Sequence, residues 1–309
     1  MRFGGHETFH IRNGWLFKGM ALLADDPEGY AGKEAADLLG VGNNMAKAIR
    51  HWLLATGLAE KGTSGVGISE VGKLVQAHDP YFTASGTWWM MHVNLVNNRT
   101  HALSWHWFFN RFGSSRFEKA VCVSSLKRYL DFQDNLRTPA QRTLERDVGV
   151  LLNSYAKSLP ARKDDPEDSK QCGLQQLNLL THFAESGFHV VNFKKKSIPP
   201  NLLGYAFSVA NPPDGNARRQ VPIQQAATGL NQPGKVFCYR AETLFDEILA
   251  SHEAPYLKKR LRVSGMAGSR VIDLCPFTPA RWLEEYYKIE AKENAKWEQK
   301  YEEEPWLVY

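Results

Sequence analysis

Residues 34–72 read EAADLLGVGNNMAKAIRHWLLATGLAEKGTSGVGISEVG, and this stretch decides how the first part of the chain is expected to fold. Apolar residues recur at helical spacing up to Leu39, and Gly40-Val41-Gly42 provides a tight turn before a second periodic segment that begins at Asn43. Glycines then separate two short runs after Leu58, and a helical pattern restarts at Glu70. The order of helix, turn, helix and hairpin predicts a winged helix-turn-helix.

The second predicted helix has two unlike faces. Met45, Ile49, Trp52 and Leu53 fall on one side, while the other side carries amides and cations but no acid. Such a face suits the major groove of DNA, where Asn can pair with adenine and Lys or Arg with guanine or phosphate. We therefore predict that DNA is contacted by Asn43, Asn44, Lys47, Arg50 and His51. The alternative is a winged helix that serves as a protein-binding module.

Length and composition predict a two-domain cytoplasmic protein. A chain of 309 residues can bury two cores, and its nine Trp and 16 Phe argue against disorder. The Pro- and charge-rich segment 158–170 is the expected linker between an N-terminal DNA-binding domain, 1–157, and a basic C-terminal domain with an acidic tail, 171–309. No leader and no apolar run of about 20 residues is apparent, so no membrane association is expected. The four scattered cysteines are expected to be free thiols.

The expected fold class is mainly α with a minor β component, in which the winged helix is joined to helical segments and followed by a mixed α/β-hairpin domain. In the C-terminal part, the pattern predicts a helix over 174–185, a strand over 187–193, a helix from 200 to about 209 and a loop over 211–231. Two basic clusters there are expected to hold the DNA backbone without reading sequence. They are Lys194, Lys195 and Lys196, and Lys258, Lys259 and Arg260.

His6-Glu7-Thr8-Phe9-His10 has the spacing of a zinc-protease motif. That motif requires a helix, yet this one follows Gly4-Gly5 and is soon succeeded by Asn13-Gly14, so we expect no zinc site and treat a zinc metalloprotease as the least favoured function. Composition and spacing alone support DNA binding and indicate no particular reaction.

A family resemblance adds to these predictions. Gly5-His6-Glu7-Thr8-Phe9, Gly14-Trp15-Leu16, Leu39-Gly40-Val41-Gly42 and Arg146-Asp147 resemble a bacterial family long catalogued as a domain of unknown function. The match is dense in the first half of the chain and looser beyond it. Members of this family are similar to the DNA-nicking component of single-strand phosphorothioation systems, in which sulfur replaces a non-bridging phosphate oxygen as part of anti-phage defence.

The resemblance implies a magnesium-dependent endonuclease that nicks double-stranded DNA together with a cysteine desulfurase and an adenylating sulfurtransferase-like protein. It reaches His6, Glu7 and Arg12 as candidate catalytic residues, with Glu7 as a ligand of Mg2+. A structural role for Glu7, as a helix cap or as a partner of Arg12 or Lys18, is the alternative. At the level of the whole protein, the alternative is a non-catalytic adaptor that brings a sulfur-transfer complex to DNA.

Overall fold

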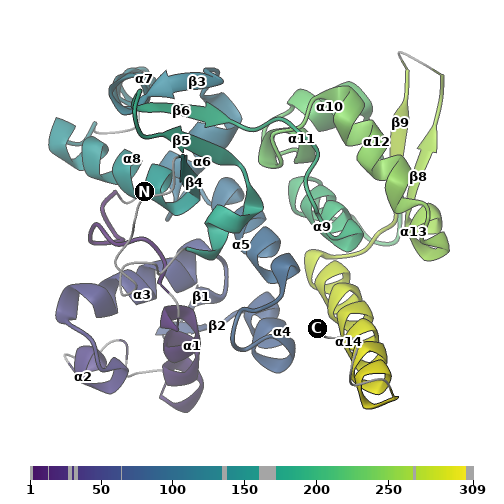
Figure 1. Cartoon of the computed structure of the whole chain (residues 1–309), viewed down its shortest axis with the longest axis horizontal. Helices are drawn as coiled ribbons and strands as arrows, with labels where there is room; N and C mark the ends of the chain where they lie inside the picture. Colours follow the sequence, from purple (N-terminus) through teal and green to yellow (C-terminus); the bar gives the residue numbers. More distant parts are fainter. Residues whose placement is uncertain are drawn as a thin grey trace.

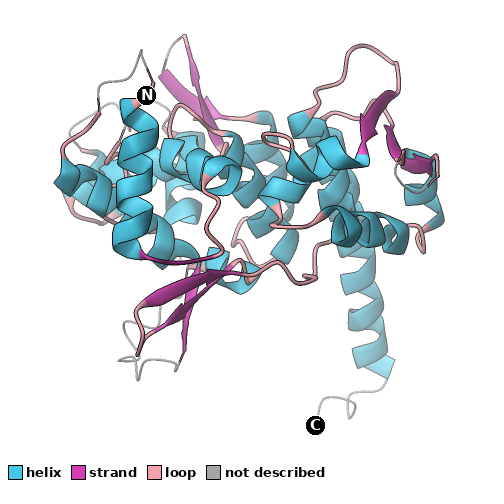
Figure 2. Ribbon diagram, turned by 90° about the horizontal axis from the view of Figure 1, so that it is seen from above, coloured by secondary structure: helices cyan, strands magenta, loops and turns pink. Residues whose placement is uncertain are grey.

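The computed structural model describes residues 3–12, 14–26, 30, 34–63, 65–133, 138–159, 172–266 and 269–303. Helices dominate, and three small sheets lie between them (Figure 1). A mixed α/β fold rich in helix is thus confirmed. Seen from above in Figure 2, the last helix leads away from the body of the protein toward the C-terminus.

The N-terminal elements follow one another in the predicted order. Gly40 takes a left-handed conformation (φ 63°) at the turn, where the N–H groups of Gly40 and Val41 bond back to carbonyls of the preceding helix. These elements are α1 (Trp15–Asp25), α2 (Ala35–Leu39), α3 (Asn43–Ala55), β1 (Ala59–Gly62), β2 (Gly65–Ile68) and α4 (Glu70–His78). The helix, turn, helix and hairpin are therefore observed, and their assignment as a winged helix stays a prediction.

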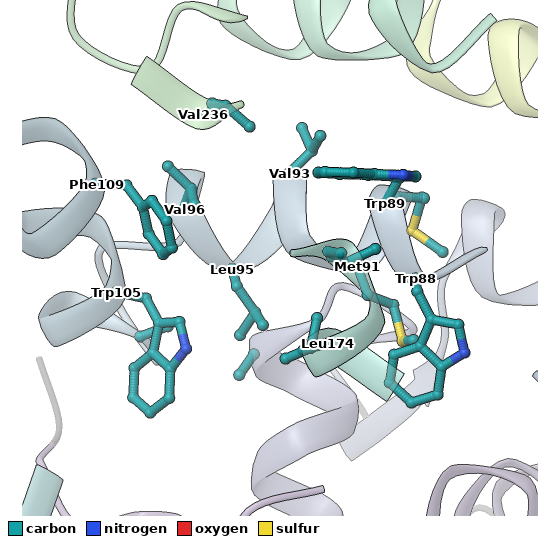
Figure 3. Packing of buried hydrophobic residues seen from close by; sticks show 14 of the residues in the cluster. Trp88, Trp89, Met91, Val93, Leu95, Val96, Trp105, Phe109, Leu174 and Val236 are labelled. Carbon is teal, nitrogen blue, oxygen red and sulfur yellow. The ribbon is translucent and has the colours of Figure 1, made fainter. Parts of the chain in front are cut away.

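Helix α5 (Ser85–Asn97) lies at the centre of the hydrophobic core. Its side chains are buried on nearly every side, so it behaves as an interior helix and not as an amphipathic one. Figure 3 shows Val236 beside the end of α5 near Val96, while Leu174 approaches from the other side. The surrounding helices are α6 (Leu103–Arg111), α7 (Lys119–Asp131) and α8 (Gln141–Tyr155). The aromatic cluster in α6 is core, because Trp105, Trp107, Phe108 and Phe109 are all buried.

A four-stranded sheet in the order β3-β6-β5-β4 covers this region. Its strands are β3 (Arg116–Glu118), β4 (Ala156–Leu159), β5 (Leu180–Phe183) and β6 (Phe188–Val191). The predicted helix over 174–185 is wrong: a short 3-10 helix, η1 (Gly173–Leu177), precedes β5, which pairs with β4 on one side and β6 on the other. Pairing with β4 and β6 overrides the local helical pattern.

The C-terminal part combines helices with a three-stranded sheet in the order β7-β9-β8. Helix α9 confirms the helix predicted from residue 200, whereas β7 and α10 interrupt the loop predicted over 211–231. The elements are α9 (Pro200–Ala210), β7 (Arg219–Pro222), α10 (Ile223–Thr228), α11 (Pro233–Val236), α12 (Ala241–Ser251), α13 (Pro255–Arg260), β8 (Leu261–Ser264), β9 (Val271–Leu274) and α14 (Pro279–Glu303).

Helix α14 returns to the N-terminal half of the chain. The hydroxyl of Tyr286 accepts a hydrogen bond from the N–H of Gly86, and the Tyr287 hydroxyl lies 2.7 Å from that of Thr87. Trp282 packs directly on Gly204 in α9, where a side chain would collide with the indole. Helix α14 therefore joins α9 to the beginning of α5.

Most of the predicted linker, residues 160–170, lies outside the described residues. The strands that flank it, β4 and β5, pair in parallel within one sheet. Whether the two halves fold independently stays a prediction. The four cysteines are free, as predicted, and all are buried. Among the described residues, no helix has the length and apolar character needed to cross a bilayer.

Candidate nucleic-acid interface

Helix α3 presents the predicted polar face at its N-terminal half. Asn43, Asn44 and Lys47 are exposed, and Arg50 is half-buried. On the opposite side, Ile49, Trp52 and Leu53 are fully buried. The first turn of α3 contains no acidic residue. Its backbone N–H groups and the nearby amides and cation can therefore all face an anionic backbone.

His51 is a correction to this predicted face. It was expected to point outward beside Arg50, but it is buried (5% exposed). Gly5 lies directly against the ring, so close that a Cβ on this glycine would collide with Nδ1 of His51. The segment that precedes α1 thus covers the C-terminal half of α3, and the surface predicted to face DNA ends at Arg50.

The same segment is fixed in place by a buried hydrogen-bond network around Asp147 of α8. Nε2 of His6 lies 3.0 Å from Oδ1 of Asp147, and this oxygen also accepts from the N–H of Gly4 at 2.8 Å. The other carboxylate oxygen accepts from the Ser104 hydroxyl at 2.9 Å. Nδ1 of His6 accepts from the N–H of Thr8, so the proton of a neutral His6 ring sits on Nε2 and is donated to Asp147.

Glu7 sits in a tight turn of unusual backbone conformation. The φ angles of Glu7 and Thr8 are 48° and 70°, in the left-handed region that β-branched Thr rarely adopts. Glu7 is half-buried, and its carboxylate makes no hydrogen bond or ion pair with the residues that the structure describes. The expected structural role, as a helix cap or as a partner of Arg12 or Lys18, therefore has no contact to support it.

Arg12 is held by aromatic rings. Its guanidinium lies 5.2 Å from the centre of the Phe9 ring and 5.3 Å from that of Trp15. The indole of Trp52 on α3 donates to the carbonyl of Phe9 at 3.1 Å. Residues 3–12 are thus fastened to both α3 and α8. Among the contacts of the described residues, however, none joins the side chains of His6, Glu7 and Arg12 to one another.

The zinc-protease pattern does not take the form that the chemistry requires. Residues 3–8 form bends and turns and not a helix, so His6 and His10 are not one helical turn apart on a common face. Both ring nitrogens of His6 already have hydrogen-bond partners. The metalloprotease alternative has no support in this geometry.

The two basic clusters are only partly available at the surface. Lys194, Lys258 and Lys259 are exposed. Lys195 is exposed but pairs with the buried carboxylate of Glu247 at 3.0 Å. Lys196 and Arg260 differ from the expectation that they hold the DNA backbone, because both side chains bind other residues of the protein.

Lys196 is buried, and its ammonium donates to the carbonyls of Asn192 and Lys194. Burial lowers the pKa of Lys196 to about 8. Arg260 pairs with Glu285 at 2.9 Å and lies over the rings of Tyr256 and Phe277. Neither side chain is placed to hold a phosphate backbone.

Comparison with known families identifies the chain. The model of a family described as a protein of unknown function, DUF4007, matches residues 3–287. The chain belongs to this family. The family predicted from the sequence motifs is thereby confirmed, and the match extends through α9 and α14, where the motifs alone were sparse.

Two crystal structures share the fold of this DUF4007 protein. A magnesium ion-bound SspB structure is 22% identical, with a TM-score of 0.79 over 94% of this chain and 96% of that one. A second SspB structure is 21% identical, with a TM-score of 0.78 over 96% of this chain and 97% of that one. No curated protein sequence matches the chain.

The described residues offer a limited fit to Mg2+. No group of three or more His, Cys, Asp or Glu side chains comes together among them. Asp147 already accepts from three donors, and Asp79 accepts from four, supplied by Thr83, Ala84 and Thr87. Glu7 remains as one available carboxylate near α3. Mg2+ is commonly held by one or two carboxylates together with substrate phosphates and water, so a site at Glu7 would depend on bound DNA.

Sequence reasoning assigned no role to Asp147. A signal was present, because an acid on the same helical stripe as Leu144, Val148 and Leu151 must be buried with its own donors. What the sequence could not show was that these donors come from residues 4–6 and from α6.

Proposed function

We propose that this DUF4007 protein binds double-stranded DNA through α3 and nicks it in a Mg2+-dependent reaction within a bacterial phosphorothioate-modification system used in anti-phage defence. The observation that carries the proposal is the position of Glu7. Its loop is tied to α3 through Trp52 and Gly5, so an available carboxylate lies beside the helix that presents amides and a lysine.

Each residue of the loop has a distinct part in this proposal. Glu7 would hold Mg2+ together with a DNA phosphate, and the ion when bound supplies charge neutralisation and a more acidic water. Arg12, poised over two rings, supplies a cation for the phosphate in the transition state. His6 is reassigned from catalysis to positioning, since both its nitrogens are engaged.

The left-handed conformation of Glu7 and Thr8 supports an active role for the loop. Conformations of this kind cost roughly 1–3 kcal/mol each and persist where surrounding contacts enforce them, often at functional sites. The His6–Asp147 network and the Trp52–Phe9 hydrogen bond are such contacts.

A second candidate is a non-catalytic adaptor that brings sulfur-transfer partners to DNA. The absence of a preformed acidic cluster among the described residues favours it. In either case, the proposed partners are a cysteine desulfurase and an adenylating sulfurtransferase-like protein, in the cytoplasm.

Incubation with supercoiled plasmid, in Mg2+ and in EDTA, separates the two candidates. A nickase converts the plasmid to open circles in Mg2+ only, and relaxed product persists after the protein is removed with detergent. An adaptor only retards the plasmid, and detergent restores its mobility. Retention of supercoiling under all Mg2+ concentrations would contradict the nickase.

A further inference from the structure

Three neighbouring cavities, which share lining residues, together make up a groove on this protein. The first, of about 630 Å3, lies between the end of α5, α6 and α7. The second, of about 410 Å3, shares Phe112, Gly113 and Ser114 with the first and is closed by α10, α11 and the start of α12. The third, of about 490 Å3, shares Val191, Phe193 and Arg240 with the second and follows β5 and β6. The flanking elements occupy the upper part of Figure 1.

Positive charge follows this groove along its length. Its cationic side chains are Arg99, Arg111 and Arg128 in the first cavity, Lys235 and Arg240 in the second, and Lys194 in the third. None of these six makes an ion pair with a described residue, and among the described lining residues Glu242 supplies the one carboxylate.

The pKa of His106, which lines the first cavity, is affected by these positive charges. Burial lowers its pKa, and the charges of Arg99 and Arg111 lower it further. Cations without carboxylate partners repel one another, and they are stabilised when an anionic chain lies between them. The groove is therefore built for a ligand with several negative charges in succession.

Aromatic rings line the same cavities as these cations. Phe132 is 78% exposed beside Arg128, and Phe193 and Phe183, at 39% and 42%, line the third cavity. Tyr129 and Trp107 also line the first cavity, with ring centres 6.4 Å apart. Exposed rings of this kind can stack on the planar bases of a nucleic acid.

We infer that this groove binds single-stranded DNA, with phosphates on the arginines and lysines and bases stacked on the phenylalanines. The inference rests on the proposed function, because opening or nicking a duplex exposes such a strand. Duplex DNA fits less well, since its bases are already stacked inside the helix and cannot lie on side-chain rings. The site is separate from α3, which contributes no residue to the three cavities.

The test compares groove variants for binding of labelled oligo-dT of about 30 nucleotides, measured by fluorescence anisotropy across a salt titration. The double variant Arg111→Gln/Arg128→Gln should lower affinity about tenfold and flatten the salt dependence. Phe132→Ala should lower affinity roughly fivefold and leave the salt dependence unchanged. Lys127→Gln is the matched control, because Lys127 is exposed on α7 beside Arg128 but does not line the groove.

Several results would overturn the inference. These are parental binding of oligo-dT by the double variant, equal competition by duplex of the same length, or tighter binding of oligo-U than of oligo-dT. Thermal melting establishes that all variants are folded. Plasmid nicking by the parent protein is scored separately. If the groove variants lose oligo-dT binding but the parent nicks no plasmid, the nickase proposal is contradicted and the single-strand groove is supported. If the parent nicks plasmid but the groove variants bind oligo-dT normally, the nickase proposal is supported and the groove inference is contradicted.

Discussion

His6 and Asp147 are buried partners, with Nε2 of the histidine 3.0 Å from a carboxylate oxygen that also accepts the N–H of Gly4. Asp147→Asn places an amide among three donors and leaves at least one of them without an acceptor. We expect a loss of about 1–3 kcal/mol in the free energy of unfolding, measured by urea denaturation. Glu145→Gln, on the exposed side of the same helix, should change stability by no more than about 0.5 kcal/mol. Equal stability of the two variants would show that the network contributes little.

The face of α3 predicts two different effects on DNA binding. Arg50→Ala should cost about 1–3 kcal/mol on a preferred site if the guanidinium reads a base, and Lys47→Ala should weaken binding to all sequences and reduce the salt dependence. Lys292→Ala, exposed on α14, is the control and should leave both unchanged. Parental binding by both α3 variants across a salt titration would show that another surface holds the duplex.

Local sequence patterns predicted the parts of this site that depend on local interactions. The glycine turn and the buried side of α3 follow from spacing alone, and both are observed. His51 was misplaced because its cover, Gly5, comes from a segment 46 positions earlier in the chain. Local periodicity carries no information about such a contact.

Strand pairing and other tertiary contacts explain the remaining differences. The apolar pattern near residue 180 predicts a helix, whereas the pairing of β5 with β4 and β6 selects a strand. Likewise, the cations of the groove come from separate segments between the end of α5 and the start of α12. No single segment of the sequence contains enough of them to predict a basic groove. Asp147 was noticed as part of a motif, but its partners lie far away in the sequence.

The exposed part of the C-terminal basic clusters should add affinity without sequence preference. Lys258→Gln/Lys259→Gln is expected to weaken specific and random duplexes to the same extent, because each lysine releases counterions from phosphate whatever the base. Electrophoretic mobility shift at two salt concentrations measures this. A loss confined to the specific site would indicate base contact and contradict the prediction. A substitution of Lys196 would test folding and not DNA binding, because this lysine is buried.

Stability should fall in mild acid because of His92. Its Nε2–H donates to the carbonyl of Val236, and its Nδ1 accepts from the Tyr155 hydroxyl, so the buried ring is neutral. Burial lowers its pKa from 6.5 to about 4. Between these two pKa values, His92 therefore binds a proton in the unfolded state but not in the folded state. The free energy of unfolding that is present above pH 6.5 is lost as the pH falls toward 4, by about 1.4 kcal/mol per pH unit.

His92→Gln should reduce this slope, although it lowers stability at neutral pH. Urea denaturation between pH 7 and pH 5 measures both. His189, whose pKa burial also lowers to about 4, accounts for part of the slope that remains. An unchanged slope in His92→Gln would mean that other groups control the acid sensitivity.

Glu7→Gln is the decisive variant for the proposed chemistry. The amide keeps the shape and the left-handed backbone of the turn but removes the charge that would hold Mg2+, so the variant should fold, bind duplex DNA and lose Mg2+-dependent nicking. The loss should exceed about a hundredfold if the carboxylate is a metal ligand. His10→Ala removes the second histidine of the zinc-protease spacing, and this variant should nick DNA like the parent. Full nicking by Glu7→Gln, together with loss of a stoichiometric zinc ion in His10→Ala, would reverse the assignment and establish a histidine metal site.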